Sequence, residues 1–173
     1  MADKNADKIA DPNKEHEERI EILRKQETLA QFQSFTEETA FDLGSALYGL
    51  VRGKRLPVVV NIRTSDRTLF HAALPGATPD NDNWVRRKSN VVLRFHQSSL
   101  LYGQLLAAKG RVISEEWGLN PLDFAGHGGS FPIHVKKAGV VAAITVSGLP
   151  QVDDHRMVIE ALSQFLKIEL PNF

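Results

Sequence analysis

Apolar residues recur along the chain with helical spacing in five segments and with strand-like spacing in four. The first 14 residues are polar, and we expect them to form a disordered tail. The expected order is α-α-β-β-α-α-β-β-α. The helices are expected over residues 15–33, from the capping pattern at 34–37 to residue 53, over 84–95 and 98–109, and from 153 onward. The strands are expected over residues 57–62, 68–73, 131–135 and 139–147.

Short-range signals indicate where several of these elements begin and how they pair. Ser34 and Glu37 form a capping-box pattern ahead of the second helix, and Asp153 is placed to cap the last helix. The turn at residues 64–67 is too short for a crossover, so the first two strands should form an antiparallel hairpin. Strand 139–147 is apolar on both faces and should be central or covered on both sides. The pattern predicts an α+β fold, an antiparallel sheet flanked by helices.

The amino-acid composition excludes several classes of protein and of functional site. The 173 residues fit one domain, and we expect the tail at 1–14, a helix at 15–33 and a domain over 34–173. Lys and Arg total 21, as do Asp and Glu, and this balance argues against a nucleic-acid binder. The absence of cysteine excludes disulfides, thiolate metal sites and cysteine nucleophiles. No apolar run is long enough for a membrane span and the N-terminus carries no secretory signal, so a cytoplasmic protein with no membrane partner is expected.

Three blocks of the sequence are similar to one known family. The blocks are LFHAALPG at 69–76 with TPDNDNWVRRK at 78–88, HGGSFPI at 127–133, and GVVAAITVSGLP at 139–150 with DDH at 153–155. Over most of residues 36–168 the chain resembles the HbpS/GlcG-like (haem-degrading domain) family, and more closely its uncharacterised branch.

The resemblance implies properties that the residues alone do not. It implies a profilin-like, PAS-like antiparallel sheet with flanking helices, and assembly into dimers or larger rings. It also implies haem as a candidate cofactor, with haem breakdown known for some relatives. No axial haem ligand transfers to a numbered residue of this chain, because this branch differs from the haem-binding relatives in the helix and loop concerned.

Lys88 stands out because it lies on an apolar helix face. At 100° per residue it falls beside Trp84 and Val91, opposite Arg86 and Asn90. A lysine there loses hydration, so its pKa should fall or a carboxylate should pair with it. One interpretation is a pocket in which Lys88 and Trp84 contact an anionic ligand. The alternative is a structural lysine whose amine reaches the surface or forms an interface salt bridge.

Two further segments are candidate ligand contacts. His71 shares a strand face with neighbours two residues away and could be a ligand or a base, although a lone strand histidine is more often structural. His127, Gly128, Gly129 and Ser130 form a loop whose backbone amides could bind an anion. The alternative for this loop is a tight turn that needs glycine.

Asp153, Asp154 and His155 could suggest a metal site. Adjacent helical residues point in different directions, however, so a helix cap with favourable negative charge explains the aspartates better. We therefore predict no metal site, and no catalytic residue can be assigned.

Two functional hypotheses follow. The first is an oligomeric small-molecule-binding protein whose pocket, lined by His71, Lys88 and residues 127–130, takes an anionic or porphyrin-like ligand. The second is an oligomeric scaffold or adaptor without catalytic activity, in which the N-terminal helix docks on a neighbour or partner. An enzyme that uses His71 or His127 as a base is a third possibility, but no motif identifies its reaction.

Overall fold

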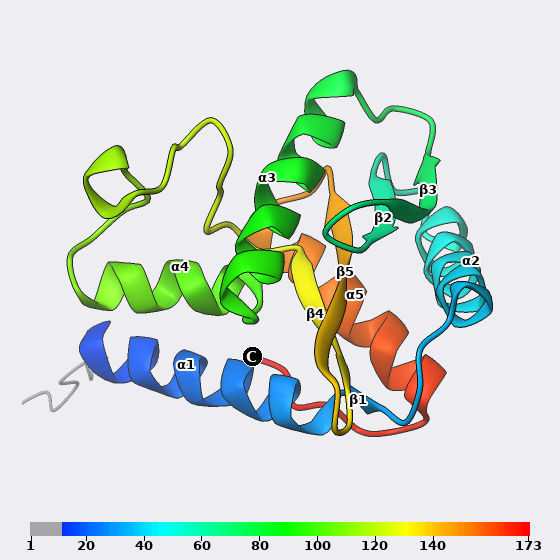
Figure 1. The fold of residues 1–173 in the computed structure, drawn as a ribbon, viewed down its shortest axis with the longest axis horizontal. Coiled ribbons are helices and arrows are strands. Elements are labelled where there is room, and N and C mark those ends of the chain that lie inside the picture. The colour runs from blue at the N-terminus through cyan, green and yellow to red at the C-terminus, as the bar shows by residue number, and fades with distance from the viewer. Residues whose placement is uncertain (1–11) are drawn as a thin grey trace, which may run out of the picture.

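The computed structural model describes residues 12–173 and has eleven helices and strands in that range (Figure 1). They are α1 (Pro12–Leu29), β1 (Gln31–Phe32), α2 (Glu37–Gly53), β2 (Val59–Arg63), β3 (Thr68–Ala73), α3 (Pro79–Phe95), α4 (Ser99–Ala108), the 3₁₀ helix η1 (Glu115–Trp117), β4 (Ser130–Val135), β5 (Gly139–Ser147) and α5 (Gln151–Leu166). The α+β class and the order of the nine expected elements are confirmed, with β1 and η1 in addition.

One five-stranded sheet organises the fold, in the order β1-β4-β5-β2-β3. The hairpins β2–β3 and β4–β5 are antiparallel, and β5 pairs with β2 in the same sense. Only the short β1 runs parallel, to β4. The strand that is apolar on both faces, β5, lies at the centre as expected, while β3 forms an edge.

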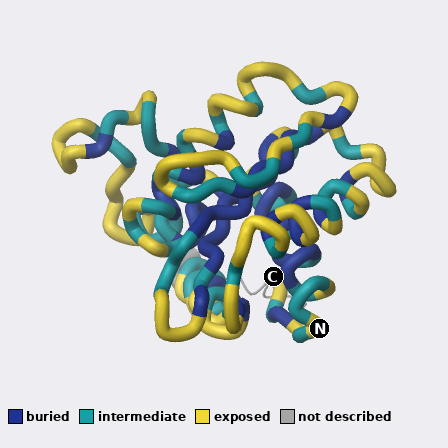
Figure 2. Tube along the Cα trace, turned by 45° about the vertical axis from the view of Figure 1, so that its right-hand side comes forward, coloured by how far each residue is buried: buried dark blue, intermediate teal, exposed yellow. Residues whose placement is uncertain are grey.

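The main core lies between the sheet and the helices α2 and α5. The side chains of Val58, Val60, Ile62, Phe131 and Ile144 on one sheet face are fully buried there. Helix α3 covers the opposite face, and Figure 2 shows buried residues concentrated along the strands with exposed residues in the loops. Among the described residues, no helix is long and apolar enough to cross a bilayer.

Several expected helix starts were wrong by a few residues. The capping box of α2 is formed by Thr36 and Thr39, not by Ser34 and Glu37. Helix α5 begins at Gln151 after Pro150, which places Asp153 inside its first turn instead of at its cap. Proline has a fixed φ and no amide hydrogen, so it fits a helix start and allows the helix to begin before the polar side chain.

The N-terminal helix lies against its own chain. Helix α1 packs beside α4, and the buried Leu23 joins Leu100 and Leu101 in a small second cluster. Gln26 is also fully buried and donates to the Pro171 carbonyl at 2.7 Å. The helix ends at Leu29, because the chain then turns into β1. Residues 1–11 of the expected tail lie outside the described residues.

Candidate functional site

A buried ion pair joins α3, β5 and α5 behind the candidate site. Lys88 is 2% exposed, and its Nζ donates to the carbonyls of Gly128 at 3.0 Å and Val146 at 2.8 Å and to Asp154 Oδ2 at 3.0 Å. An ammonium group has three donors, so all of them are used. Burial lowers the pKa of Lys88 and raises that of Asp154, and each partner's charge opposes the shift of the other. The sequence expectation of a buried lysine with a carboxylate partner is confirmed.

A polar cleft of about 210 Å³ opens in front of this pair. Four of the candidate residues line it: Trp84, Lys88, His127 and Gly128. The start of α5 and the chain just before it complete the walls with Ser147, Gly148, Leu149, Gln151 and Asp154, and Asn81 adds a further polar side chain from α3. All three Lys88 donors already bind groups of the protein. A ligand in this cleft would therefore form its hydrogen bonds with other lining side chains.

An apolar cavity of about 270 Å³ lies on the other side of His127. Leu106 and Ala107 of α4, Ile113 and Phe124 line much of it, and Arg87 and Arg111 also belong to its lining. Gly103 makes the close approach of α4 possible, because a Cβ there would lie 1.9 Å from the Gly126 carbonyl oxygen. The cavity therefore combines an apolar interior with positive charge.

His127 lines both cavities and is exposed. Its ring meets the Trp84 ring edge-to-face with centroids 5.1 Å apart, and the Arg87 guanidinium lies over the same indole at 4.3 Å. Partial burial lowers the pKa of His127, and the charges of Arg87 and Lys88 lower it further. The lowered pKa favours the neutral imidazole, in which one ring nitrogen has a lone pair available to a metal or a proton.

Polar side chains of α3 bind the backbone of residues 121–123, a segment beside the apolar cavity. Arg86 donates to the Leu122 carbonyl at 2.7 Å, Arg87 to that of Pro121 at 3.0 Å, and Asn90 to that of Asp123 at 2.9 Å. Positions 86 and 90 are one turn apart and therefore lie on one face of the helix. The polar face of α3 that the sequence predicted therefore does not face only water, because it also holds residues 121–123 in place through hydrogen bonds.

His71 lies apart from both cavities, on the edge strand β3. Its Nδ1 is 3.2 Å from Asn61 Nδ2 and its Nε2 is 3.1 Å from Asp82 Oδ1, so both ring nitrogens have partners in the chain. If the Asn61 amide donates, the ring is the Nε2–H tautomer and donates to Asp82. Asn61 Oδ1 is buried and has no hydrogen-bond partner within residues 12–173. The structure does not bring His71 together with Lys88 and the loop at 127–130.

The two glycines of this loop are required by close packing. A Cβ on Gly128 would lie 2.1 Å from the Gln151 carbonyl oxygen, and Gly129, at φ +121°, would meet the Val146 carbonyl oxygen at 2.4 Å. The Gly128 amide donates to Gln151 Oε1 at 3.2 Å. Ser130 is fully buried, and its Oγ lies 2.8 Å from Thr145 Oγ1. Gly129 and Ser130 therefore do not line the cleft but lie buried behind its wall.

The three residues at the start of α5 point in different directions, as expected. Asp153 lies 3.4 Å from Arg156, Asp154 pairs with Lys88, and the buried His155 lies 2.8 Å from Gln26 Oε1 through its Nε2. No group of three or more metal-binding side chains occurs within the described part of the chain.

Sequence reasoning missed several residues of the site. The sequence patterns did not assign Arg87, Arg111, Phe124 or Gln151 to the site. Arg87 and Asn81 lie within the block at 78–88 that carries the resemblance. Arg111 and Gln151 have no local signal, because long loops and helix packing bring them to the site.

Fold and site together define a single-sheet α+β domain with two cavities on its α3-covered side. The family described as "Haem degrading protein HbpS-like" matches residues 35–163, and the chain belongs to this family. UPF0303 proteins are similar over most of their length: that of Streptomyces coelicolor is 49% identical over 144 residues, 83% of this chain and 91% of the relative, and that of Edwardsiella ictaluri is 44% identical over 152 residues, 88% and 97%.

Solved structures share the fold. The crystal structure of the Ybr137w protein has a TM-score of 0.77 at 31% identity, covering 86% of this chain and 87% of that one. HbpS has a TM-score of 0.61 at 21% identity, covering 79% and 92%, and the PduOC:haem complex has 0.64 at 12%, covering 79% and 98%. The last two likenesses concern the fold alone. The expected family is confirmed.

Proposed function

We propose that this protein binds an anionic small molecule with a flat apolar body, haem included, at the cavities beside His127. The observation that carries the proposal is the position of His127, a neutral imidazole that lines both an apolar cavity with two arginines and a polar cleft. Apolar walls with a few convergent polar groups are typical of small-molecule sites. Arg87 and Arg111 suit carboxylates because a guanidinium can donate two parallel hydrogen bonds.

The residue types fit a haem. Haem proteins hold the iron with an axial ligand that is often histidine, and His127 is the histidine at these cavities. Arg87 and Arg111 would pair with the propionates, and Leu106 and Phe124 would contact the ring. Each cavity is smaller than the roughly 300–1,000 Å³ of common ligand sites, but both are open, so a large ring can project from them. When bound, haem would supply iron–oxygen chemistry that the side chains lack.

Family membership supports the proposal. The family description names haem degradation, and the PduOC structure of the same fold contains haem. We propose binding as the primary property and leave turnover to be measured on the haem-loaded protein. A cytoplasmic location and self-association remain predictions.

The first test is a haem titration followed at the Soret band, with His127→Ala beside the wild type. We expect saturable one-to-one binding by the wild type, and an affinity about tenfold or more lower in the variant, which is at least ~1.4 kcal/mol. The Soret position should also change, because the side chain that would bind the haem iron is removed. His134→Ala on β4 is the matched control and should titrate like the wild type.

Two results would count against this function. Absence of a saturable Soret shift in the wild type removes haem from the proposal. Identical titrations for His127→Ala and the wild type remove His127 as the contact.

The alternative is an oligomeric scaffold without catalytic activity. It is favoured by large apolar side chains that stay exposed on one loop: Val112 at 73%, Trp117 at 45% and Leu122 at 74%. A stable oligomer that shows no Soret shift with haem would put this function first.

A further inference from the structure

One buried hydroxyl of the polar cleft is free to bind a ligand. Ser147 is the last residue of the central strand β5 and lines the cleft with Lys88 and Asp154. It is 3% exposed, and its Oγ forms no hydrogen bond with any of residues 12–173. Thr145, on the same face of the strand, has a partner in Ser130 at 2.8 Å. Buried hydroxyls are normally paired, so the Ser147 hydroxyl differs from its neighbour in being available to the cleft.

Two side-chain amides add hydrogen-bond donors to the same cleft. The Gln151 oxygen accepts from the Gly128 amide at 3.2 Å, which leaves its Nε2 group to donate elsewhere. The Asn81 oxygen accepts from the Thr78 amide at 2.8 Å, which leaves its Nδ2 group in the same state. Neither NH₂ group donates to another group in the described part of the chain. With Ser147, they supply the cleft with three neutral donor groups.

The charges around the cleft favour an anion. Both oxygens of Asp154 already accept hydrogen bonds, Oδ2 from Lys88 and Oδ1 from the Leu149 amide, and the lysine offsets the charge of the carboxylate. The cations Arg87 and Lys88 lower the pKa of His127, which lines the same cleft, so the electrostatic potential at this ring is positive. A carboxylate that enters the cleft would therefore meet both free donors and a favourable potential.

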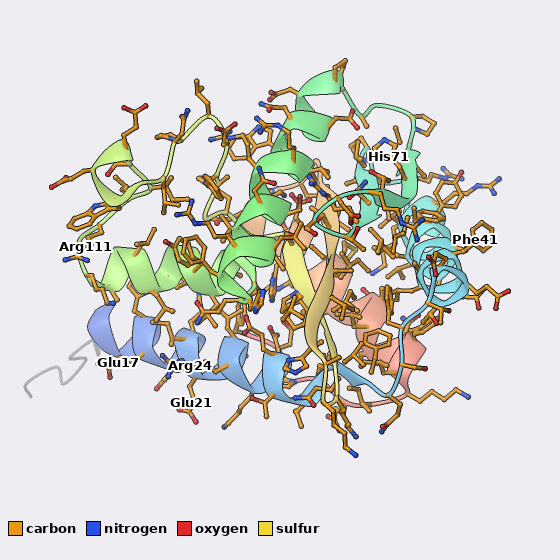
Figure 3. The ribbon with its side chains drawn as sticks, viewed as in Figure 1. Glu17, Glu21, Arg24, Phe41, His71 and Arg111 are labelled. Atoms are coloured by element: carbon orange, nitrogen blue, oxygen red, sulfur yellow. The ribbon has the colours of Figure 1, made fainter. Side chains whose placement is uncertain are left out.

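Other groups that could bind an anion do not reach this cleft. Figure 3 labels Arg111, which lines the apolar cavity, and His71 on β3, and it shows them on opposite sides of α3. Neither of the two belongs to the lining of the cleft. The choice of ligand is therefore made by Ser147, Gln151 and Asn81.

We propose that the polar cleft is a second site that binds a small carboxylate, with the Ser147 hydroxyl and the Gln151 amide donating to its oxygens. The cleft volume of about 210 Å³ is below the roughly 300–1,000 Å³ of common ligand sites, so the ligand has few non-hydrogen atoms. This site goes beyond the proposed function, because its ligand is not the flat apolar molecule. The haem contacts proposed above line the apolar cavity, and only His127 is shared by the two sites.

Acetate is the probe, and the indole N–H signals of the two tryptophans in a proton–nitrogen correlation spectrum are the readout. Trp84 lines the cleft, whereas Trp117 lies in η1 outside it. When acetate replaces chloride at constant ionic strength, the Trp84 signal should shift and saturate at millimolar acetate, and the Trp117 signal should stay fixed. Acetamide has nearly the same shape without the charge and should bind much more weakly.

Two variants test the donors. Ser147→Ala should weaken acetate binding about tenfold, because a hydrogen bond to a charged group is lost, and it should keep the fold, because this hydroxyl has no partner in the described chain. Gln151→Glu retains an oxygen for the Gly128 amide but replaces the donor with a negative charge, so it should abolish the saturable shift. Gln164→Glu makes the same change at an exposed position of α5, and this matched control should bind acetate like the wild type.

Three results would overturn the second site: a Trp84 signal that does not respond to acetate, equal affinities for acetate and acetamide, or unchanged acetate binding by both Ser147→Ala and Gln151→Glu. The haem titration is separate from this test. A saturable Soret shift without a response to acetate would refute the second site and leave the proposed function standing. A response to acetate without a Soret shift would do the opposite.

Discussion

A single buried ammonium group joins three separate parts of the chain. Lys88 on α3 donates to the backbone at Gly128 and Val146 and to the carboxylate of Asp154 on α5. Asp154 in turn accepts from the Leu149 amide at 3.0 Å. A buried ion pair of this kind contributes little net stability compared with apolar packing, but loss of one partner is costly. Lys88 therefore fixes the back wall of the cleft.

Lys88→Met should destabilise the protein by about 3–5 kcal/mol, because the Asp154 carboxylate would stay buried without its cation. The double variant Lys88→Met/Asp154→Asn should recover a substantial part of the loss, since no unpaired charge remains and the asparagine oxygen still accepts from Leu149. Urea unfolding followed by circular dichroism measures both. A single variant as stable as the wild type would show that the pair is dispensable.

Helix α4 owes its position to contact between two backbones. Gly103 faces Gly126 so closely that a Cβ on Gly103 would lie 1.9 Å from the Gly126 carbonyl oxygen. Leu106, one turn along, lines the apolar cavity. The cavity and the helix packing thus depend on the same small residue.

Gly103→Ala should cost about 1–3 kcal/mol, because backbone atoms must move to admit the methyl group. Gly49→Ala is the matched control on α2, where a Cβ would meet nothing within 4 Å. It should stabilise the protein by about 0.5–1 kcal/mol, since glycine is a poor helix former. Denaturant midpoints of the two variants should move in opposite directions. Equal midpoints would contradict the close contact.

At the scale of the whole molecule, contacts join the first helix, the last helix and the C-terminal segment. Gln26 on α1 lies 2.8 Å from His155 Nε2 on α5 and donates to the Pro171 carbonyl at 2.7 Å. The Phe173 ring stacks on His155 with centroids 6.1 Å apart. Burial lowers the pKa of His155 to about 3, and the charges of Arg156 and Lys88 act in the same direction.

This buried histidine predicts an acid dependence of global stability. Between its ordinary pKa of about 6.5 and the folded value of about 3, the unfolded chain binds a proton that the folded chain does not. The free energy of unfolding should therefore be highest above pH 6.5 and fall towards pH 3, at up to about 1.4 kcal/mol per pH unit from this group. His155→Gln keeps a partner for Gln26 but cannot titrate, so its profile should be flatter. Parallel profiles would refute the assignment.

Much of the architecture is predictable because it depends on local patterns. The order of nine elements, the hairpin of the first two strands and the central place of 139–147 follow from periodicity and turn length, and all agree with the structure. Helix starts were less predictable, because Thr36 and Pro150 compete with nearby Ser34 and Asp153 as caps. The two-residue β1 is too short to have a pattern of its own.

The sequence by itself determined the family, the α+β order and the position of Lys88 on an apolar helix face, since each depends on residues close together in the chain. Only the tertiary structure decided which residues share a cavity. It placed His127 beside Arg87 and Arg111, gave His71 partners away from them, and docked α1 on its own chain. These contacts join positions that are tens of residues apart in the chain. They depend on how side chains pack in the folded protein, and the local spacing of residues does not determine that packing.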